Sequence, residues 1–237
     1  MIKIEHTEVL GWEAATRGMR NPLNSWEKCD SQWKTACVEF ELGKNDTKLM
    51  KTLANAGDDH GKVVRFLEVY VDITAPLYWW KEFRTYRKGR QFMDDGDDFT
   101  DVDDLEMHIE TNSCSTMHKI HAKKFELDDF SHEHLFPNTI GVGGNTVVKH
   151  GLGMLVEIVF ILNAYRDDYL KTKDKRYWWQ MIQLLPSSYN QKRTVKLNYQ
   201  ALRRMYHARK NHKLDEWREF CAWCETLPYF KEICIQE

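Results

Sequence analysis

The sequence is poor in glycine and proline. It contains 12 glycines and 5 prolines in 237 residues, whereas the two together make up about 12% of an average globular protein. Folds built from many short strands need these residues at their turns. The shortage therefore argues against an all-β barrel or sandwich and favours long helices.

The chain also lacks an excess of charge of one sign. Its 34 Lys and Arg residues against 36 Asp and Glu residues give a formal net charge of −2. A near-neutral protein has no overall electrostatic attraction to nucleic acid or to an anionic membrane, so we expect neither as a partner. Hydrophobic residues at 42% and charged residues at 30% also exclude disorder of the whole chain.

No segment has the features of a membrane span or a signal peptide. The most apolar stretch, 151–165, is too short to cross a bilayer and contains Glu157. The first residues carry a charge at every second or third position, unlike a signal peptide. The cysteines lack the dense spacing of a secreted disulfide framework. They are Cys29, Cys37, Cys114, Cys221, Cys224 and Cys234. We therefore expect a cytoplasmic protein with reduced thiols.

Aromatic residues, in contrast, are abundant. The chain has 9 Trp, 10 Tyr and 11 Phe, which together make 13% of its residues. This is more than the core of a domain of this size needs. The excess indicates flat surfaces that meet a ring-shaped ligand or another subunit.

Hydrophobic periodicity predicts a single α/β domain in which helix predominates. Apolar residues alternate over 62–73, which predicts a central strand, and 2–10 resembles an edge strand. Residues 125–134 and 138–145 resemble surface connections. Helices are expected over 11–19, 26–41, 47–57 with Asp46 or Thr47 as cap, 77–87, part of 145–172, 175–185, 194–211 and 214–226.

The segment 94–110 differs from the rest of the chain. Nine of its seventeen residues are acidic, and its hydrophobic residues are scattered. The acids do not follow the ligand order of an EF-hand loop. This composition predicts a mobile, solvated loop, and we expect no metal site there.

Three other motifs favour structural interpretations. Cys221 and Cys224 form a Cys-x-x-Cys inside an amphipathic helix, which favours core packing over a redox or zinc site. The histidines between His118 and His134 lack the spacing of metal ligands. Gly141–Gly144 does not follow a convincing strand, so it gives only weak support for phosphate binding.

The helix expected after Thr194 carries a polar pair among hydrophobic residues. At 100° per residue, Asn198 and Arg209 lie about 20° apart on one helix face. Buried without partners, an amide and a guanidinium would destabilise the fold. They are therefore a structural pair, a contact with a partner helix, or part of a binding site.

Five short segments stand out, in chain order. They are Gly57–His60 before the central strand, Thr85-Tyr86-Arg87, Asn112–His118, Leu184-Leu185-Pro186, and Asn198 with Leu202 and Arg209. In their order and spacing they resemble motifs of the flavin-dependent thymidylate synthases, where Thr85-Tyr86-Arg87 resembles Arg-His-Arg and Asn112–His118 resembles Asn-Glu-x-Ser-x-Arg-Tyr. Together they cover most of the chain.

The chain also departs from these motifs. About twenty additional residues, at about 91–110, separate Arg87 from Asn112, and they coincide with the acidic segment. Ser113 stands where the family has Glu, and His118 where it has Tyr. Met117 replaces an Arg that contacts the nucleotide phosphate, a loss that Lys119, Lys123 or Lys124 would have to offset.

The resemblance implies both a fold and an activity. The fold is a single domain over 1–237, helix-rich with a central, mainly antiparallel sheet. The activity is reductive methylation of a pyrimidine deoxynucleotide, dUMP to dTMP, with FAD, NADPH and methylenetetrahydrofolate. The family's members are usually homotetramers. A phage-type member would act in the host cytoplasm.

The resemblance also implies site residues. Those that would contact FAD are His60, Arg84, Arg87, Asn198 and His212. Those that would contact the nucleotide are Asn112, Ser113, Ser115, His118 and Arg209, with Ser115 and Arg209 in catalytic roles.

Two alternatives remain open. Ser113 and Met117 favour a protein that keeps the fold and binds or sequesters a nucleotide without catalysis. In a plain structural or interaction domain, Asn198 and Arg209 would only be polar residues of the core.

Overall fold

A computed structural model describes residues 2–34, 39–57, 60–89, 105–106, 109–137, 140–141 and 148–235. Contacts divide the chain into two compact units. Unit 1 contains 74–81 and 113–193, and unit 2 contains 2–73, 82–112 and 194–237. Strands β4 and β10 pass through both units. That the chain forms one domain over 1–237 stays a prediction.

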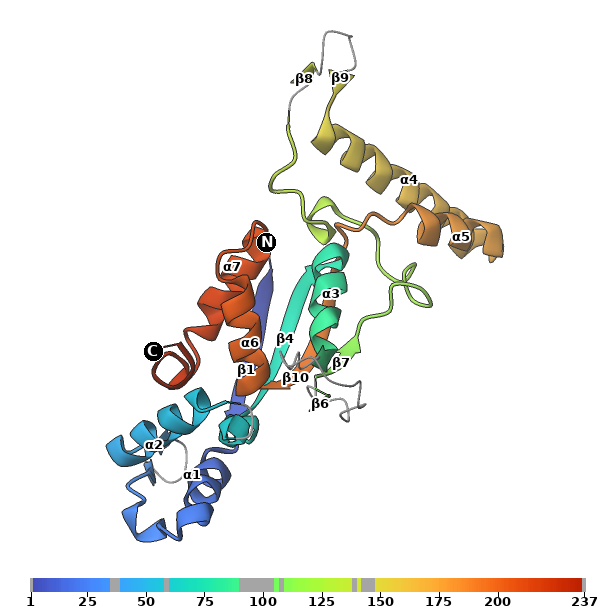
Figure 1. Cartoon of the computed structure of the whole chain (residues 1–237). Coiled ribbons are helices and arrows are strands. Elements are labelled where there is room, and N and C mark those ends of the chain that lie inside the picture. Colours follow the sequence, from blue (N-terminus) through green and yellow to red (C-terminus); the bar gives the residue numbers. More distant parts are fainter. Residues whose placement is uncertain are drawn as a thin grey trace, which may run out of the picture. The chain divides into compact units, whose positions relative to one another are not determined.

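The central element is a four-stranded antiparallel sheet in the order β1-β4-β10-β7. Its strands are β1 (Lys3–Leu10), β4 (Glu68–Pro76), β10 (Asn190–Asn198) and β7 (Glu110–Ser113). In β4, Val69, Val71 and Ile73 are buried while the residues between them are half-exposed, the alternation expected of a strand with one face on the core. The helix-rich fold with a central antiparallel sheet and an edge strand at β1 is confirmed (Figure 1).

Two helices of unit 2 complete its core beside the sheet (Figure 1). α6 (Tyr199–Arg209) follows β10 directly, and α7 (Asp215–Cys224) is followed by a short π-helix, η6 (Lys231–Ile235). Tyr199 is fully buried, packs edge-on against Phe230 at 5.3 Å and donates its hydroxyl to the Pro228 carbonyl at 2.7 Å. Cys221 and Cys224 are buried on α7, so their predicted core packing is confirmed.

The predicted helix 194–211 is wrong at its start. Residues 194–198 belong to β10, and α6 begins at Tyr199. Gln191, Arg193, Val195 and Leu197 are buried in alternation, a period of two that the polar composition of this stretch concealed.

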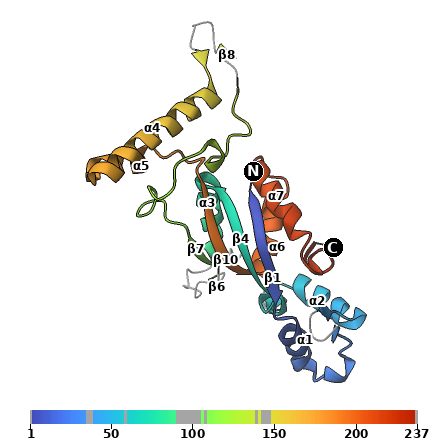
Figure 2. The same ribbon diagram turned by 180° about the vertical axis from the view of Figure 1, so that it is seen from behind.

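At the end of β1, unit 2 continues into α1 (Trp12–Arg20) and α2 (Lys44–Asn55), which Figure 2 shows next to each other. The predicted helix 26–41 is wrong. The short helices η1 (Asn21–Leu23) and η2 (Trp26–Lys28) lead instead into a hairpin of β2 (Gln32–Lys34) and β3 (Glu39–Glu41). Trp33 faces Phe40 across this hairpin with ring centroids 5.1 Å apart, a cross-strand pair that stabilises the extended form.

The N-terminus of α2 is capped by Asp30, a residue distant in the sequence. The prediction that Asp46 or Thr47 caps it is wrong, because the Asp30 carboxylate accepts from the backbone N–H groups of Asn45 at 2.9 Å and Asp46 at 3.0 Å. Asp46 itself is buried and pairs with Arg20. After α2, the 3-10 helix η3 (Gly61–Arg65) occupies the first part of the strand predicted over 62–73.

In unit 1, the two predicted helices are present as α4 (Gly151–Thr172) and α5 (Lys175–Leu184), and they pack against each other. These helices and the segment before them share one hydrophobic core. It consists of Ile120, Phe125, Phe130, Leu155, Leu162 and Met181. Phe125 and Phe130 are buried, so 125–134 is not simply a surface connection. Asn163 fixes this segment, because its side-chain amide donates to the Phe125 carbonyl and accepts from the Phe125 N–H, both at 2.9 Å.

The remaining elements are short. The helix predicted over 77–87 is α3 (Leu77–Phe83) followed by the 3-10 turn η4 (Arg84–Arg87). The others are β5 (Lys88–Gly89), β6 (Leu105–Glu106), η5 (Leu127–Asp129), β8 (Ile140–Gly141) and β9 (Val148–Lys149). Most of the predicted loop 94–110 and of the segment 138–145 lies outside the described residues. Among the described residues, no helix combines the length and hydrophobicity that a membrane span requires.

Candidate functional site

Arg209 is the last residue of α6, and its side chain is 19% exposed. Its Nη1 lies 2.7 Å from Glu82 Oε1. The guanidinium carbon lies 5.3 Å from the centroid of the Tyr86 ring and 5.1 Å from that of Trp217, both within the range of a cation–π interaction. Arg209 is thus held at one edge by a carboxylate and against two aromatic rings.

Glu82 is the centre of this arrangement. Its Oε2 accepts a hydrogen bond from Trp217 Nε1 at 2.6 Å, and its Oε1 also lies 3.4 Å from His212 Nε2. We call Glu82, Tyr86, Arg209, His212 and Trp217 the Glu82 cluster. It joins the end of α3 and η4 to the end of α6 and the first turn of α7, and its five residues all belong to unit 2.

The cluster is stabilised by its aromatic surroundings. Trp217 is fully buried; it stacks on Phe83 at 6.4 Å and packs edge-on against Phe220 at 5.6 Å. A tryptophan packed in this way presents its ring N–H in a fixed direction, here to Glu82. Arg209 also lies at a helix C-terminus, where the helix dipole favours a cation.

Two further observations describe the electrostatics of the cluster. Burial raises the pKa of Tyr86, although the nearby Arg209 cation opposes the shift, so this phenol is neutral at physiological pH. Arg209 Nε is buried and has no hydrogen-bond partner in the described part of the chain. A buried unpaired donor costs stability. The fold therefore fixes Arg209 in a position that does not satisfy all of its donors.

Asn198 lies at the junction of β10 and α6 and is the N-cap of that helix. Its Oδ1 accepts from the Ala201 N–H at 3.0 Å. The predicted placement of Asn198 and Arg209 on one helix face is therefore wrong, since Asn198 precedes the first helical turn. The cap uses only the carbonyl oxygen of the side chain, so the amide hydrogens are not engaged by it.

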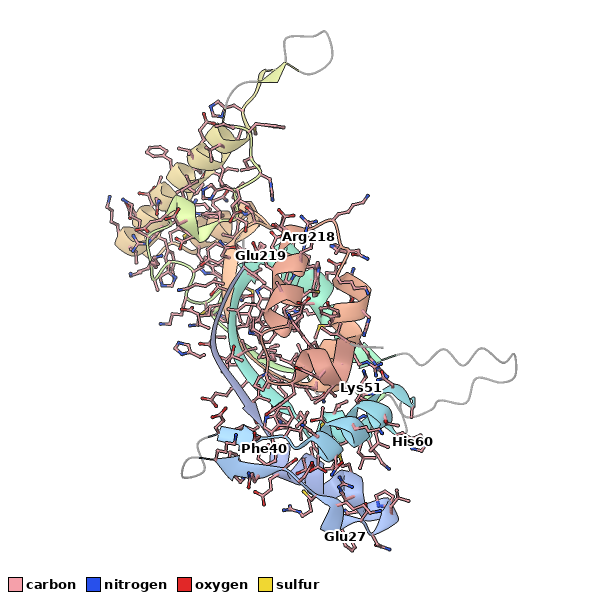
Figure 3. The ribbon with its side chains drawn as sticks, turned by 90° about the vertical axis from the view of Figure 1, so that its left-hand side faces the viewer. Glu27, Phe40, Lys51, His60, Arg218 and Glu219 are labelled. Atoms are coloured by element: carbon pink, nitrogen blue, oxygen red, sulfur yellow. The ribbon has the colours of Figure 1, made fainter. Side chains whose placement is uncertain are left out.

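The other residues predicted to contact a flavin lie on short elements of unit 2. His60 is exposed and immediately precedes η3. Figure 3 shows it far from Arg218 and Glu219, the α7 residues that follow Trp217, so the described fold does not bring His60 into the Glu82 cluster. Arg84 is exposed on η4, and Arg87 is the last residue of that turn.

The residues predicted to contact a nucleotide, apart from Arg209, lie at and after the end of β7. Asn112 and Ser113 are its last residues, and both are exposed. Ser115 Oγ accepts from the backbone N–H groups of Met117 at 3.2 Å and His118 at 2.9 Å. These bonds form a tight turn and leave the Ser115 hydroxyl hydrogen available to a ligand.

Other hydrogen bonds within unit 1 anchor this turn. Gln191 Nε2 donates to the Cys114 carbonyl at 2.6 Å, and Trp178 Nε1 donates to the Met117 carbonyl at 3.0 Å. The backbone on both sides of Ser115 is therefore fixed, while the side chains of Ser115 and His118 remain exposed.

Of the predicted site residues, Arg209 and His212 share one carboxylate. Glu82, which contacts both, and Trp217 were not predicted from the sequence. Glu82 lies in the last turn of α3 and Tyr86 on η4, and no local pattern linked either residue to α6 or α7. Among the described residues, no group of three His, Cys, Asp or Glu side chains is placed to hold a metal ion.

No protein-family model matches the chain. No curated protein matches it by sequence either. Solved structures do match. The thymidylate synthase ThyX from Helicobacter pylori with FAD and dUMP aligns at a TM-score of 0.63 and 14% identity, over 100% of this chain and 98% of that one. A second structure of that enzyme with FAD and dUMP gives 0.61 and 15%, over 99% of each chain.

A third match comes from a different source. The UMP/dUMP methylase PolB from Streptomyces cacaoi, bound with 5-Br dUMP, aligns at a TM-score of 0.55 and 13% identity, over 98% of this chain and 91% of that one. At these identities the matches establish the fold. The chain has the fold of the flavin-dependent thymidylate synthases over its whole length, as the sequence resemblance implied.

Proposed function

We propose that the chain is a divergent flavin-dependent thymidylate synthase-like enzyme. It would reductively methylate a pyrimidine deoxynucleotide, dUMP to dTMP, with FAD, NADPH and methylenetetrahydrofolate, and it would act in the cytoplasm, or in the host cytoplasm if a phage encodes it. The observation that carries this proposal is the end-to-end fold match to an enzyme whose structure contains FAD and dUMP.

The residues proposed for FAD suit such a ligand chemically. They are His60, Arg84, Arg87, Asn198 and His212. When bound, the flavin would supply the hydride chemistry. An isoalloxazine ring needs donors near its carbonyl oxygens, where negative charge collects on reduction. The Asn198 amide hydrogens, which the helix cap does not use, and the exposed Arg84 side chain are donors of the right kind.

The residues proposed for the nucleotide are Asn112, Ser113, Ser115, His118 and Arg209. Ser115 and Arg209 would contact the reacting base, which they would orient and polarise. Met117 is 51% exposed and cannot replace the charge of the family's phosphate-binding Arg. Lys123 is paired with Asp129 at 2.8 Å, whereas Lys119 and Lys124 are exposed, so we propose that these two contact the phosphate.

We also propose that the chain forms a homo-oligomer, a tetramer by the family resemblance, and that α4 provides its interface. Only Leu155 and Leu162 of this 22-residue helix are buried. Met154 is 60% exposed and Phe160 is 75% exposed. Large apolar residues gathered on one exposed helix are typical of a surface that a second subunit covers.

The second candidate function is nucleotide binding without catalysis. It is favoured by Ser113 and Met117, which stand where the family has its Glu and Arg. It is also favoured by Glu82, which pairs with Arg209. Such a protein would retain the nucleotide-binding fold and sequester a nucleotide or a nucleotide signal.

The visible spectrum of the purified protein is the first test. Flavin bands near one FAD per chain, or stoichiometric binding of added FAD, would support the proposal. A colourless protein that does not bind FAD would contradict it. With FAD bound, NADPH oxidation stimulated by dUMP and formation of dTMP with methylenetetrahydrofolate would indicate the enzyme. Nucleotide binding without turnover would indicate the second candidate.

A further inference from the structure

Glu82 lies three residues before Thr85-Tyr86-Arg87 and contacts Arg209, a residue proposed to contact the reacting base. Its carboxylate is 28% exposed and binds Arg209 through Oε1 at 2.7 Å and Trp217 through Oε2 at 2.6 Å. The His212 ring nitrogen at 3.4 Å is a longer contact to Oε1. The two short contacts fix both oxygens of the carboxylate.

The first consequence is mechanical. An arginine side chain has several rotatable bonds, and its position is defined only when the guanidinium is held. Tyr86 and Trp217 contact the guanidinium as aromatic partners, and Glu82 binds one of its edges. The rings limit where the group can lie, and the carboxylate determines which of its N–H groups remain for a ligand.

The second consequence is electrostatic. The Glu82 carboxylate offsets the charge of the Arg209 guanidinium, so the pair has no net charge that would attract a phosphate. An anion that bound the free edge of the guanidinium would also lie within a few ångströms of the carboxylate, and the two negative charges would repel each other in a partly buried site. A carbonyl oxygen carries no formal charge and avoids this repulsion, while it still accepts the N–H groups of Arg209.

We infer that Glu82 is a positioning residue with two effects on Arg209. It orients the guanidinium, and it makes an uncharged acceptor, such as a carbonyl of the pyrimidine base, a better ligand for Arg209 than a phosphate. This inference rests on the proposed function, because it assumes that Arg209 faces a pyrimidine nucleotide. The phosphate must then be bound by other residues.

The test uses the FAD-loaded full-length protein and two variants. Glu82→Gln removes the charge and keeps one of the two acceptor oxygens, and Glu82→Ala removes both oxygens. Glu68→Gln is the matched control, because Glu68 pairs with Lys196 at 3.0 Å on the sheet. Deoxyuridine and dUMP affinities are measured by calorimetry. The rate at which phenylglyoxal modifies Arg209 is followed by peptide mass spectrometry.

Glu82→Gln should raise the affinity for dUMP relative to deoxyuridine roughly tenfold, because a repelling charge is removed. Glu82→Ala should weaken deoxyuridine binding and speed the modification of Arg209, whereas Glu68→Gln should change neither. An unchanged affinity ratio in Glu82→Gln would overturn the selectivity. Equal modification rates in the wild type and Glu82→Ala would overturn the positioning role.

These outcomes are distinguishable from failure of the proposed function. If the wild-type protein binds neither deoxyuridine nor dUMP, the nucleotide assignment fails and the selectivity fails with it. The phenylglyoxal rates still decide the positioning role, because that measurement requires no nucleotide. Thermal melts of both Glu82 variants show whether either one has lost its fold instead.

Discussion

Arg20 donates two hydrogen bonds to the same carboxylate oxygen of Asp46, from Nε at 2.9 Å and from Nη2 at 2.6 Å. The other oxygen accepts from the Ser31 hydroxyl at 2.6 Å and from the backbone N–H groups of Asp30 and Ser31, both at 3.0 Å. The Asp46 side chain is fully buried, and that of Arg20 is 6% exposed. One carboxylate therefore connects α1, the entrance to the β2–β3 hairpin and α2.

Replacing Asp46 should destabilise unit 2 strongly. Asp46→Ala leaves the buried Arg20 cation and two backbone donors without partners, and removing one member of a buried pair costs about 3–5 kcal/mol. Urea denaturation followed by circular dichroism measures the loss. Glu41→Ala is the control, because it breaks an exposed pair with Lys34 and should change the stability little. Equal losses in the two variants would mean that the Asp46 network is not a major source of stability.

The same carboxylate should make stability fall in acid. Burial alone would raise the pKa of Asp46, but hydrogen bonds from Ser31 and Arg20 outweigh it and hold the pKa below its usual value. A lowered pKa contributes stability above the unfolded value near 3.8, and this contribution is lost as the pH falls through the folded value. Melting temperatures between pH 6 and pH 3 should therefore fall less in Asp46→Asn than in the wild type. Parallel curves for the two proteins would contradict this.

Two substitutions of Asn198 distinguish its role as a helix cap from its proposed role in flavin binding. Asn198→Asp keeps the oxygen that accepts from the Ala201 N–H but removes the amide donors, whereas Asn198→Ala removes both. Only the alanine variant should lose the stability of the cap, about 1 kcal/mol. Both should bind FAD more weakly, measured by titration of apoprotein. If Asn198→Asp binds FAD as tightly as the wild type, Asn198 has only a structural role.

Arg209→Ala should abolish nucleotide binding and leave the fold intact. The substitution shortens the last residue of α6, and Glu82 keeps its hydrogen bond from Trp217. Calorimetry with dUMP measures the binding, and a far-ultraviolet spectrum checks the fold. Arg204, five residues earlier on α6, provides the control variant Arg204→Ala. Unchanged affinity in Arg209→Ala would remove Arg209 from the site.

The sequence predicted those elements whose signals are local. Strand β4 has a clear alternation, α4 is a long apolar run, α5 has an amphipathic pattern, and Pro186 marks the end of α5. The β2–β3 hairpin could not be predicted in this way. It depends on Asp46, which is at least 15 residues from the Ser31 groups that it binds. Local helix propensity was overridden there by tertiary contacts.

The candidate site shows the same difference between residues with local signals and residues joined by long-range contacts. Arg209 was identified from helical spacing and family resemblance, although that spacing was counted from a residue that lies outside the helix. Glu82 is 135 residues from Trp217 in the chain, and no local pattern connects them. Its ordinary position on an aromatic helix gave no indication that it would bind Arg209. Only the folded structure brings these groups together.

The exposed face of α4 leads to a prediction about assembly. If a second copy covers this helix, Phe160→Asp should shift the protein to a smaller oligomer, because a charge buried in an apolar interface is strongly unfavourable. Size-exclusion chromatography with light scattering measures the mass. Leu23→Asp is a matched control, since Leu23 and Phe160 are both 75% exposed but Leu23 lies on η1, outside α4. A wild-type monomer, or an oligomer that both variants leave unchanged, would show that α4 is not the interface.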